Sequence, residues 1–429
     1  MRRRDLLLSA MAPRGSLNLL DTAAAHVALA GKDKGRRKIW GRIGGTAAEH
    51  ASAAELARQL GPFLPAVELE PFRFKAHRAL EWEVRAGGKI LETAMPAPFE
   101  ARFPDRDVSA PVEPVDPDGD WRRVSGKWAF VNSLATTSTM LNVVREKLLY
   151  RRAVEHGAAG LLFAVPTPAG SRWKSVLPVD KPYALRDERY PGGLRPIPCF
   201  SMDSIDGTAL ASLSGERATA AIRYDSDGPH EGRNVVGFLP GTGAFAAGVM
   251  CHIDSFFTGA CDNASGIAAM VGLAEALSRL PSRARKPDFY FLGLSAHHDE
   301  AAGMRDWVKR DPDRFRRVRQ LFLLEHVDAL PAPLNNNRIA YLGSDGWPEV
   351  RGVVDGLARK SGVMTVAPKM VDACIADLFV TCGRVKSFCL MNGPPFYHTD
   401  HDTLDRISER GIRNAVDFHW LLLKSLKLI

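Results

Sequence analysis

The stretch that decides the fold spans residues 247–280 and reads AGVMCHIDSFFTGACDNASGIAAMVGLAEALSRL. It opens with an apolar run over 247–251 that is typical of a buried strand, and it closes with apolar residues at helical spacing over 265–280. His252, Asp254 and Asp262 lie between these two runs. A strand, a polar turn and a helix in this order predict one unit of an alternating α/β fold, with the polar side chains beyond the carboxyl end of the strand.

The same alternation continues along the rest of the chain. Two amphipathic helices are expected near the start, over 17–30 and 47–60. After residue 280, apolar strands are expected over 289–294, 321–324 and 387–391, and helices over 301–309, 349–360 and 405–427. Buried strands alternating with helices predict a mostly parallel mixed sheet with helices on both faces, which is a three-layer αβα architecture.

A region with a different texture precedes this alternation. It contains expected strands over 127–131, 161–165 and 197–201 and expected helices over 143–156 and 204–210, with the turn Gly157-Ala158-Ala159-Gly160 after the first helix. This pattern resembles a protease-associated domain. We therefore expect three parts: residues 1–120 begin a peptidase-like domain, residues 121–222 form a smaller inserted β-rich α/β domain, and residues 223–429 carry the main metal site.

Polar residues of one chemical kind follow the expected strands. They are His252 and Asp254, His297 and His298, Glu325, and His398. Imidazole and carboxylate are the ligands that zinc prefers, and a two-metal site uses one carboxylate to bridge both ions. Taken singly, Asp262 also fits an ordinary helix cap, and His252 also fits a hydrogen-bonded core histidine. Their combination at one edge of a sheet favours a metal site.

Three motifs occur in an order that resembles the co-catalytic zinc aminopeptidases, the family that also holds glutamate carboxypeptidase and the transferrin receptor. They are His252-Ile253-Asp254, the GACDNASG turn at 259–266 and the YHTDHDT segment at 397–403. The resemblance covers most of residues 17–429. It implies two zinc ions, with His252 and Asp262 as ligands of one, Asp262 as the bridge, and His398 as a ligand of the other.

The resemblance also implies roles for two further carboxylates. Asp254 would hold the outer ring nitrogen of His252 and so assist catalysis from behind the metal. Glu325 stands where the family has an aspartate ligand, and nearby Asp328 competes with it for that place.

The sequence departs from the family at its paired glutamates, where it has His297 and His298. His298 is an acceptable zinc ligand, but a neutral imidazole predicts a weaker second site or a different divalent metal. His297 would take the place of the catalytic base, and Asp299 and Glu300 are alternatives in the same segment. A third interpretation is a chain without catalytic activity. Tyr397 is expected to pack beside His398, with oxyanion stabilisation as the alternative.

The function implied by the resemblance is that of a zinc-dependent exopeptidase, specifically an aminopeptidase, which hydrolyses peptide bonds with metal-activated water. The alternatives are a non-catalytic binding protein or a single-metal relative that resembles glutaminyl cyclases. The expected partner is a peptide or a small amide. The net charge of +8 is spread along the chain without a nucleic-acid-binding motif, and no apolar run approaches the roughly 20 residues of a membrane span. The twin-arginine-like start is interrupted at Pro13, which favours the cytoplasm over export.

Overall fold

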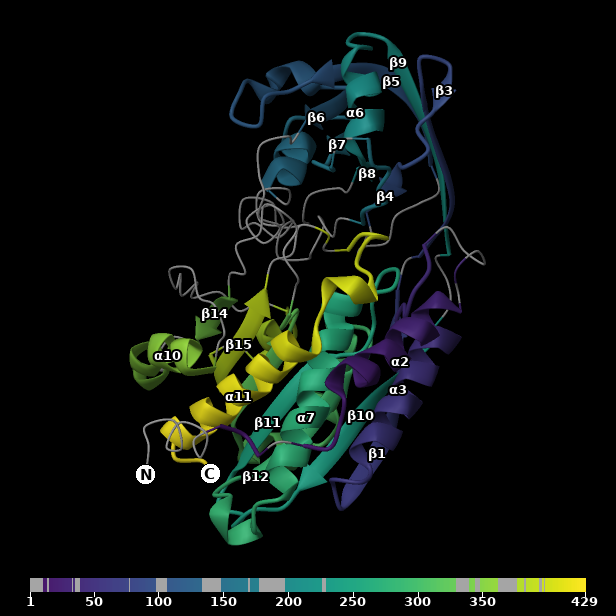
Figure 1. Cartoon of the computed structure of the whole chain (residues 1–429). Coiled ribbons are helices and arrows are strands. Elements are labelled where there is room, and N and C mark those ends of the chain that lie inside the picture. Colours follow the sequence, from purple (N-terminus) through teal and green to yellow (C-terminus); the bar gives the residue numbers. More distant parts are fainter. Residues whose placement is uncertain are drawn as a thin grey trace.

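The computed structural model of the chain describes residues 11–13, 15–32, 34, 39–76, 78–97, 106–132, 148–168, 170–176, 197–225, 229–328, 339–343, 348–361, 376–381, 383–392, 396 and 398–429. These residues form two sheets, each with its own hydrophobic core. Figure 1 shows the sheet with β5 to β9 above the sheet with β10 to β15.

The main sheet has seven strands in the order β1-β10-β12-β11-β13-β15-β14. The four strands β12, β11, β13 and β15 are neighbours and run parallel, while β1, β10 and β14 pair in antiparallel fashion at the two sides. Strand bounds are β1 Ala66–Lys75, β10 Pro229–Leu239, β11 Ala246–His252, β12 Asp288–Leu294, β13 Val318–Glu325, β14 Ile339–Gly343 and β15 Lys386–Asn392.

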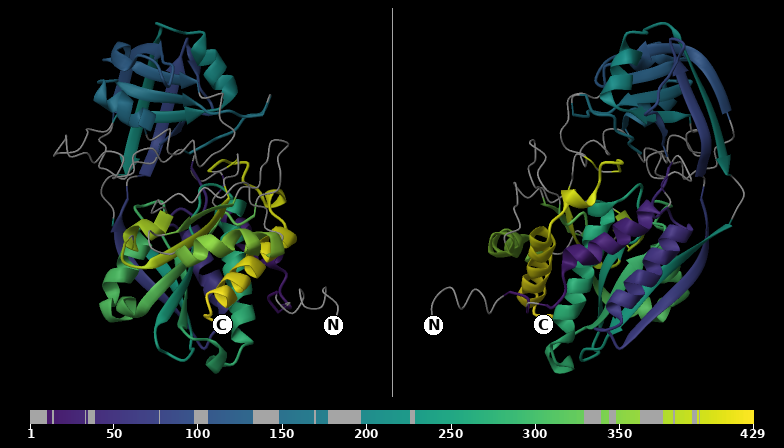
Figure 2. Two further views of the ribbon diagram at one scale, coloured as in Figure 1. Left: turned by 90° about the vertical axis from the view of Figure 1, so that its left-hand side faces the viewer. Right: turned by 45° about the vertical axis from the view of Figure 1, so that its right-hand side comes forward.

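Helices cover both faces of the main sheet. On β11, Val249 and Cys251 face one core while Met250 faces another, as the two-residue period of a strand requires. The first core includes residues of α2 (Leu19–Gly31), α3 (Ala47–Leu60), α7 (Gly266–Ser278), α10 (Pro348–Ser361) and α11 (Glu409–Ser425). The second includes residues of α8 (Ala302–Arg310) and α9 (Pro312–Arg317). The predicted three-layer α/β fold is confirmed, and Figure 2 shows its layers from two further sides.

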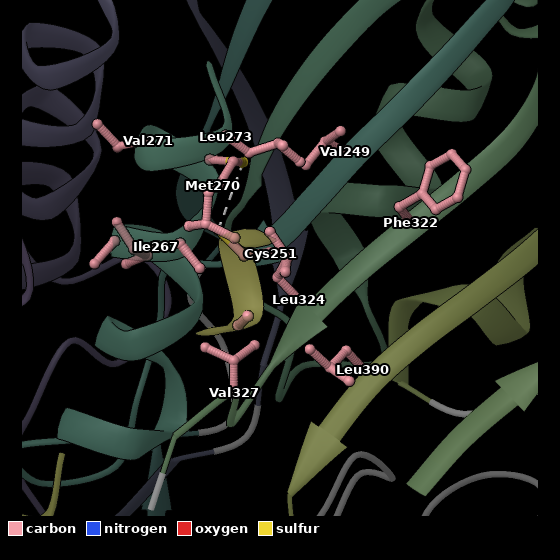
Figure 3. Packing of buried hydrophobic residues seen from close by; sticks show 14 of the residues in the cluster. Val249, Cys251, Ile267, Met270, Val271, Leu273, Phe322, Leu324, Val327 and Leu390 are labelled. Carbon is pink, nitrogen blue, oxygen red and sulfur yellow. Dashed lines mark hydrogen bonds between the residues drawn. The ribbon is translucent and has the colours of Figure 1, made fainter. Parts of the chain in front are cut away.

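Helix α7 is the central helix of the first core. Figure 3 shows Ile267, Met270 and Leu273 turned towards the strands, and the Met270 and Cys251 sulfur atoms lie 3.8 Å apart. All of these side chains are buried, and burying a large apolar side chain stabilises a fold by roughly 1.5–3 kcal/mol. This packing fixes the start of α7, and with it Asp262, against the ends of β11 and β13.

The last helix begins later than the sequence predicts. The expected helix starts at residue 405, whereas a short 3-10 helix occupies Leu404–Arg406 and α11 begins at Glu409. Ser408 has extended backbone angles, and its side chain accepts a hydrogen bond from the Gly411 N–H. A serine in this conformation caps a helix, so it ends one helical segment and starts the next.

The second sheet has eight strands in the order β3-β2-β9-β5-β6-β7-β8-β4. Strand bounds are β2 Arg78–Ala86, β3 Lys89–Ile90, β4 Met95–Pro96, β5 Arg106–Pro114, β6 Trp128–Asn132, β7 Gly160–Ala164, β8 Cys199–Met202 and β9 Arg217–Asp225. Helix α6, Ser204–Ala211, packs beside β7. Strands β2 to β5 precede residue 121 and also belong to this sheet, so the sheet includes residues outside the range 121–222 that is predicted as an insert.

Among the described residues, no helix combines the length and the apolar character that a membrane crossing requires.

Candidate metal centre

The polar residues predicted from the sequence lie together at the carboxyl ends of four adjacent parallel strands. His252 is the last residue of β11 and Glu325 is the last residue of β13. His298 follows β12, and His398 follows β15. Because these strands are neighbours in the sheet, their ends bring the four side chains to one edge, which is where α/β proteins bind ligands.

The carboxylate of Asp262 lies at the middle of this group and faces four imidazole rings. Its Oδ1 atom is 3.1 Å from Nε2 of His252 and 2.8 Å from Nε2 of His326. Its Oδ2 atom is 3.1 Å from Nε2 of His398 and 3.9 Å from Nε2 of His298. Each carboxylate oxygen therefore faces a separate pair of histidines, as a carboxylate that bridges two cations would.

The turn that holds Asp262 is fixed by backbone contacts. The carboxylate of Asp402 accepts hydrogen bonds from the N–H groups of Cys261 and Asp262, at 2.8 and 2.9 Å. Gly259 has a φ of 54°, and a Cβ at this position would lie 2.3 Å from the Asp262 carbonyl oxygen and from the Ser255 Cβ. Glycine is thus required where the chain turns from β11 towards α7.

The outer nitrogens of three of these histidines contact oxygen acceptors. Nδ1 of His252 is 2.9 Å from the Asp254 carbonyl oxygen, and Nδ1 of His298 is 2.7 Å from the Asp254 carboxylate. Nδ1 of His398 is 3.2 Å from the carbonyl oxygen of Val176. When Nδ1 donates to an oxygen, the neutral ring presents an unprotonated Nε2, which is the form that ligates a metal.

The centre contains many hydrogen-bond acceptors, which are imidazole nitrogens and carboxylate oxygens, and few hydrogen-bond donors. Nε2 of His298 and Nε2 of His398 are only 3.0 Å apart, although both rings are buried. Nε2 of His252 and Oδ2 of Asp262 are buried and make no hydrogen bond with the described residues. Unpaired buried acceptors are costly, and a cation between them would remove that cost.

Among the described residues, four groups of three residues are compact enough to hold a metal ion, and two of these groups share Asp262. The two that share it are His252, Asp262 and His326, and Asp262, His298 and His398, each with ligand atoms within 4.8 Å of one another. Nitrogen and carboxylate oxygen donors in this number suit zinc. Asp262 is common to both groups, so the residues fit one ion in each group with a shared carboxylate.

The titration of the centre follows from burial and from its own charges. Burial lowers the pKa of His398 to about 3 and also lowers the pKa of His298. Burial alone would raise the pKa of Asp262, but the imidazoles of His326, His252 and His398 hold it well below its usual range. The second group therefore offers a carboxylate and two neutral imidazoles, the protonation states that metal ligation needs.

His326 is the ligand candidate that the sequence did not single out. It directly follows Glu325, and consecutive strand residues normally point to opposite faces. The φ of His326 is 49°, so the chain leaves the extended conformation there and the ring turns towards Asp262. Glu325 also stays near the centre: its Oε1 is 3.8 Å from Nε2 of His326, and it forms a further group with His252 and His297.

His297, the predicted base, lies at the edge of the centre. Its ring stacks on that of His252, with centroids 4.2 Å apart. Its Nδ1 atom is 3.1 Å from the carboxylate of Asp377, and its N–H donates to Asp254. Asp377 belongs to the 3-10 helix Ala376–Thr381 and is fully buried, yet nothing in its local sequence marks it as a partner of His297.

The alternative carboxylates point elsewhere. Asp299 makes two contacts of 2.7 Å with Arg78, and Glu300 is 3.7 Å from Arg305. Asp328 accepts hydrogen bonds from the N–H and hydroxyl groups of Ser408. None of these three joins the groups described above. Tyr397 lies outside the described residues.

Comparison with protein families finds one similarity in the part of the chain that carries this centre. Residues 234–422 match the model of peptidase family M28. The chain is therefore similar to M28 peptidases over this segment. The M28 match spans β11, α7, β13 and β15, and therefore every strand that ends at the centre. A comparison with curated protein sequences finds no match.

Solved structures share the fold across nearly the whole chain. A peptidase M28 precursor from Shewanella amazonensis matches with a TM-score of 0.72 and 14% identity, over 98% of this chain and 95% of that one. The zinc aminopeptidase BSAP from Bacillus subtilis matches with a TM-score of 0.66 and 18% identity, over 96% of both chains. An aminopeptidase from Aneurinibacillus sp. strain AM-1 matches with a TM-score of 0.61 and 18% identity, over 95% of this chain and 93% of that one. The fold of nearly the whole chain, including both sheets, thus occurs in known structures.

Proposed function

We propose that the protein is a zinc-dependent exopeptidase, an aminopeptidase that hydrolyses peptides or small amides. The observation that carries this proposal is the position of Asp262, whose two oxygens each face a separate pair of imidazoles. Such a carboxylate suits two metal ions in one site, and paired ions are a common solution for peptide hydrolysis. The M28 match over residues 234–422 supports the same chemistry.

The proposed ligands divide between two ions. His252, Asp262 and His326 hold the first, with Glu325 close enough to add a second carboxylate. Asp262, His298 and His398 hold the second. The second ion has no carboxylate of its own, so it is bound less tightly than the first or is a different divalent metal.

The chain's own residues prepare the hydrolysis. Zinc, when bound, polarises the scissile carbonyl and lowers the pKa of bound water. Asp377 holds Nδ1 of His297, so Nε2 of that ring is the atom that accepts the proton of the attacking water and returns it to the leaving amine. Asp254 fixes the segment that carries the base, because its two carboxylate oxygens accept the N–H groups of His297 and His298.

Metal analysis joined to an activity assay tests the proposal. The purified full-length chain is analysed for bound metals and then assayed on a panel of aminoacyl p-nitroanilides, with and without added Zn²⁺ or Co²⁺. We expect more than one ion per chain and release of p-nitroaniline from substrates with a free amino group, but not from their N-acetylated forms. Fewer than one ion per chain together with no turnover after metal addition would reject the proposal.

A second candidate rests on the His297-His298 pair, which occupies the place of the family's paired glutamates. In that case the chain is a non-catalytic or single-metal relative, in the manner of the transferrin receptor or of glutaminyl cyclases. The same experiment separates the two, because this candidate predicts one ion or none and no peptide hydrolysis. We further propose that the second sheet includes a protease-associated-type insert, which β6, β7, β8 and α6 support by their order.

A further inference from the structure

We call the part of the chain that is built on the second sheet and α6 the second body. A short segment next to it lies along the loop that carries His398. We call residues 172–176 the strap and residues 398–402 the ligand loop. Ser175 and Thr399 form an antiparallel bridge. On either side of it, the Val176 N–H donates to the His398 carbonyl at 3.0 Å and the Asp400 N–H donates to the Lys174 carbonyl at 3.1 Å. The ligand loop is therefore paired with a distant part of the sequence.

Side chains reinforce this pairing. The indole ring of Trp173 stacks on the imidazole of His401 with a centroid distance of 4.6 Å and an interplanar angle of 19°. The carboxylate of Asp400 accepts a hydrogen bond from the Lys174 N–H at 3.0 Å. Trp173 is buried, so the stack shields the backbone bonds beneath it from water.

The contact that matters for the metal is made by Val176. Its carbonyl oxygen lies 3.2 Å from Nδ1 of His398, and the His398 ring is buried. Donation from Nδ1 to this carbonyl leaves Nε2 of His398 unprotonated and aimed at Oδ2 of Asp262, 3.1 Å away. An acceptor behind a ligating histidine sets the orientation and the tautomer of the ring.

The strap is held from its other side by the second body. Arg172 contacts the carboxylate of Asp206 at 2.5 Å and that of Asp203 at 3.5 Å, at the start of α6. The hydroxyl of Ser201 on β8 donates to the Ser175 carbonyl. The carbonyl that orients His398 therefore depends on contacts made outside the main sheet.

We infer that the second body acts as a positioning element for the second metal ion, through the strap. This inference rests on the proposed two-ion centre. Nδ1 of His252 is held by Asp254, which is part of the main domain. Loosening the strap should therefore lower the affinity for the ion held by His298 and His398. The affinity for the ion held by His252 and His326 should stay unchanged. Arg172 and Trp173 are positioning residues in this sense, since neither is among the proposed ligands.

The test titrates metal-free, full-length protein with Zn²⁺ against a chromophoric chelator, and repeats the titration with Co²⁺ to follow each site by its visible absorption. Arg172→Ala and Trp173→Ala are compared with the wild type. We expect the dissociation constant of the weaker ion to rise about 10-fold or more, the usual effect of losing a contact behind a ligand, while that of the tighter ion stays unchanged. Arg172→Lys and Trp173→Phe, which keep the charge and the ring, should restore most of the affinity.

Arg223→Ala is the matched control. Arg223 also pairs with an aspartate of the second body, Asp107, at 2.8 Å, and its side chain is 43% exposed compared with 44% for Arg172. It lies on β9, away from the strap, so this variant should bind both ions as the wild type does.

Three results would overturn the inference. The first is unchanged affinity for both ions in Arg172→Ala and Trp173→Ala, and the second is an equal loss of affinity for both ions in these variants. The third is a loss of affinity in Arg223→Ala as large as in Arg172→Ala. Thermal unfolding of each metal-free variant shows whether it is folded, and if one alanine variant is unfolded the comparison rests on the other, with Arg223→Ala beside it. If the wild type itself binds no metal, the proposed function fails, which is a different result from wild-type binding without any effect of the strap.

Discussion

The carboxylate of Asp377 lies 3.1 Å from Nδ1 of His297, although the two residues are far apart in the sequence. The contact is an aspartate–histidine pair of the kind that holds an imidazole in one tautomer for proton transfer. Such a pair would allow His297 to act as the base of the proposed hydrolysis. The pair also explains why a buried carboxylate sits beside a metal centre without joining either ligand group.

Replacing Asp377 by Asn tests this role. The amide cannot stabilise the charge that His297 acquires when it takes a proton, so kcat should fall about 10- to 100-fold while KM changes little. Bound metal should stay at the wild-type level. Steady-state kinetics and metal analysis of the same preparation measure both. An unchanged kcat, or a loss of metal that accounts for the lower rate, would show that Asp377 does not orient the base.

Asp299→Asn is the control for that variant. Asp299 is another shielded carboxylate close to His297 in the sequence, but it pairs with Arg78. We expect lower stability with kcat within about threefold of the wild type, since a group outside the centre does not transfer the proton. A large loss of kcat with normal metal content would instead favour Asp299 as the base.

Two adjacent residues, Glu325 and His326, are candidate ligands of the proposed first ion. His326 Nε2 lies 2.8 Å from Asp262, whereas Glu325 was expected from the sequence to be the ligand. His326→Ala should therefore lower the affinity for the tighter ion by at least 100-fold, and Glu325→Gln should lower it less. Metal content after dialysis against a graded chelator series measures both. The reverse order would return the ligand role to Glu325.

How much of this centre could be predicted depends on how local each contact is. His252 and Asp262 could be located because a strand, a turn of small residues and a helix fix their positions within a short stretch of sequence. His326 could not be predicted, because its ring reaches the centre through a positive φ that its residue type does not indicate. Asp377 and Val176 reach the centre only through the tertiary fold. The pairing of β2 with β9 spans more than a hundred residues, so it too is a contact that the local sequence does not reveal.

Buried His419 should make the fold sensitive to acid. Burial lowers its pKa to about 4, from the ordinary 6.5 that applies when the chain is unfolded. The unfolded chain therefore takes up this proton first, and the free energy of unfolding should fall as pH drops from 6.5 towards 4, by up to about 1.4 kcal/mol per pH unit for this residue. In His419→Phe that contribution disappears. Urea unfolding of the metal-free protein at pH 7.5, 6 and 5 measures the slopes.

The value at pH 7.5 serves as the internal reference for His419→Phe. There both states of the wild type carry a neutral imidazole, so any difference reflects packing against Phe388 and Phe418 and the loss of the Ala415 contact. The free energy of unfolding of the variant, relative to that of the wild type, should increase at each lower pH. Parallel curves for the two proteins would show that His419 titrates alike in the folded and unfolded chain.

Arg42 should be essential to the shape of the loop between β11 and Asp262. Its guanidinium is fully buried and donates to four backbone carbonyls. They belong to His26, Ile253, Thr258 and Gly259. Arg42→Met fills the same space but leaves these acceptors without donors, so the free energy of unfolding should fall by about 3 kcal/mol or more. Arg58→Met removes an exposed guanidinium paired with Glu55, so it should lower the free energy of unfolding far less than Arg42→Met does.

The effect of Arg42→Met should extend to the metals. Three of the four carbonyls belong to the segment 253–259, which contains Asp254 and connects His252 to the turn that holds Asp262. Without the guanidinium the two ends of that segment are no longer held at a fixed distance, and the affinity for the first ion should fall as well. Chelator titration of Arg42→Met and Arg58→Met at a temperature where both are folded measures this. Equal metal affinity in the two variants would confine Arg42 to the stability of the fold.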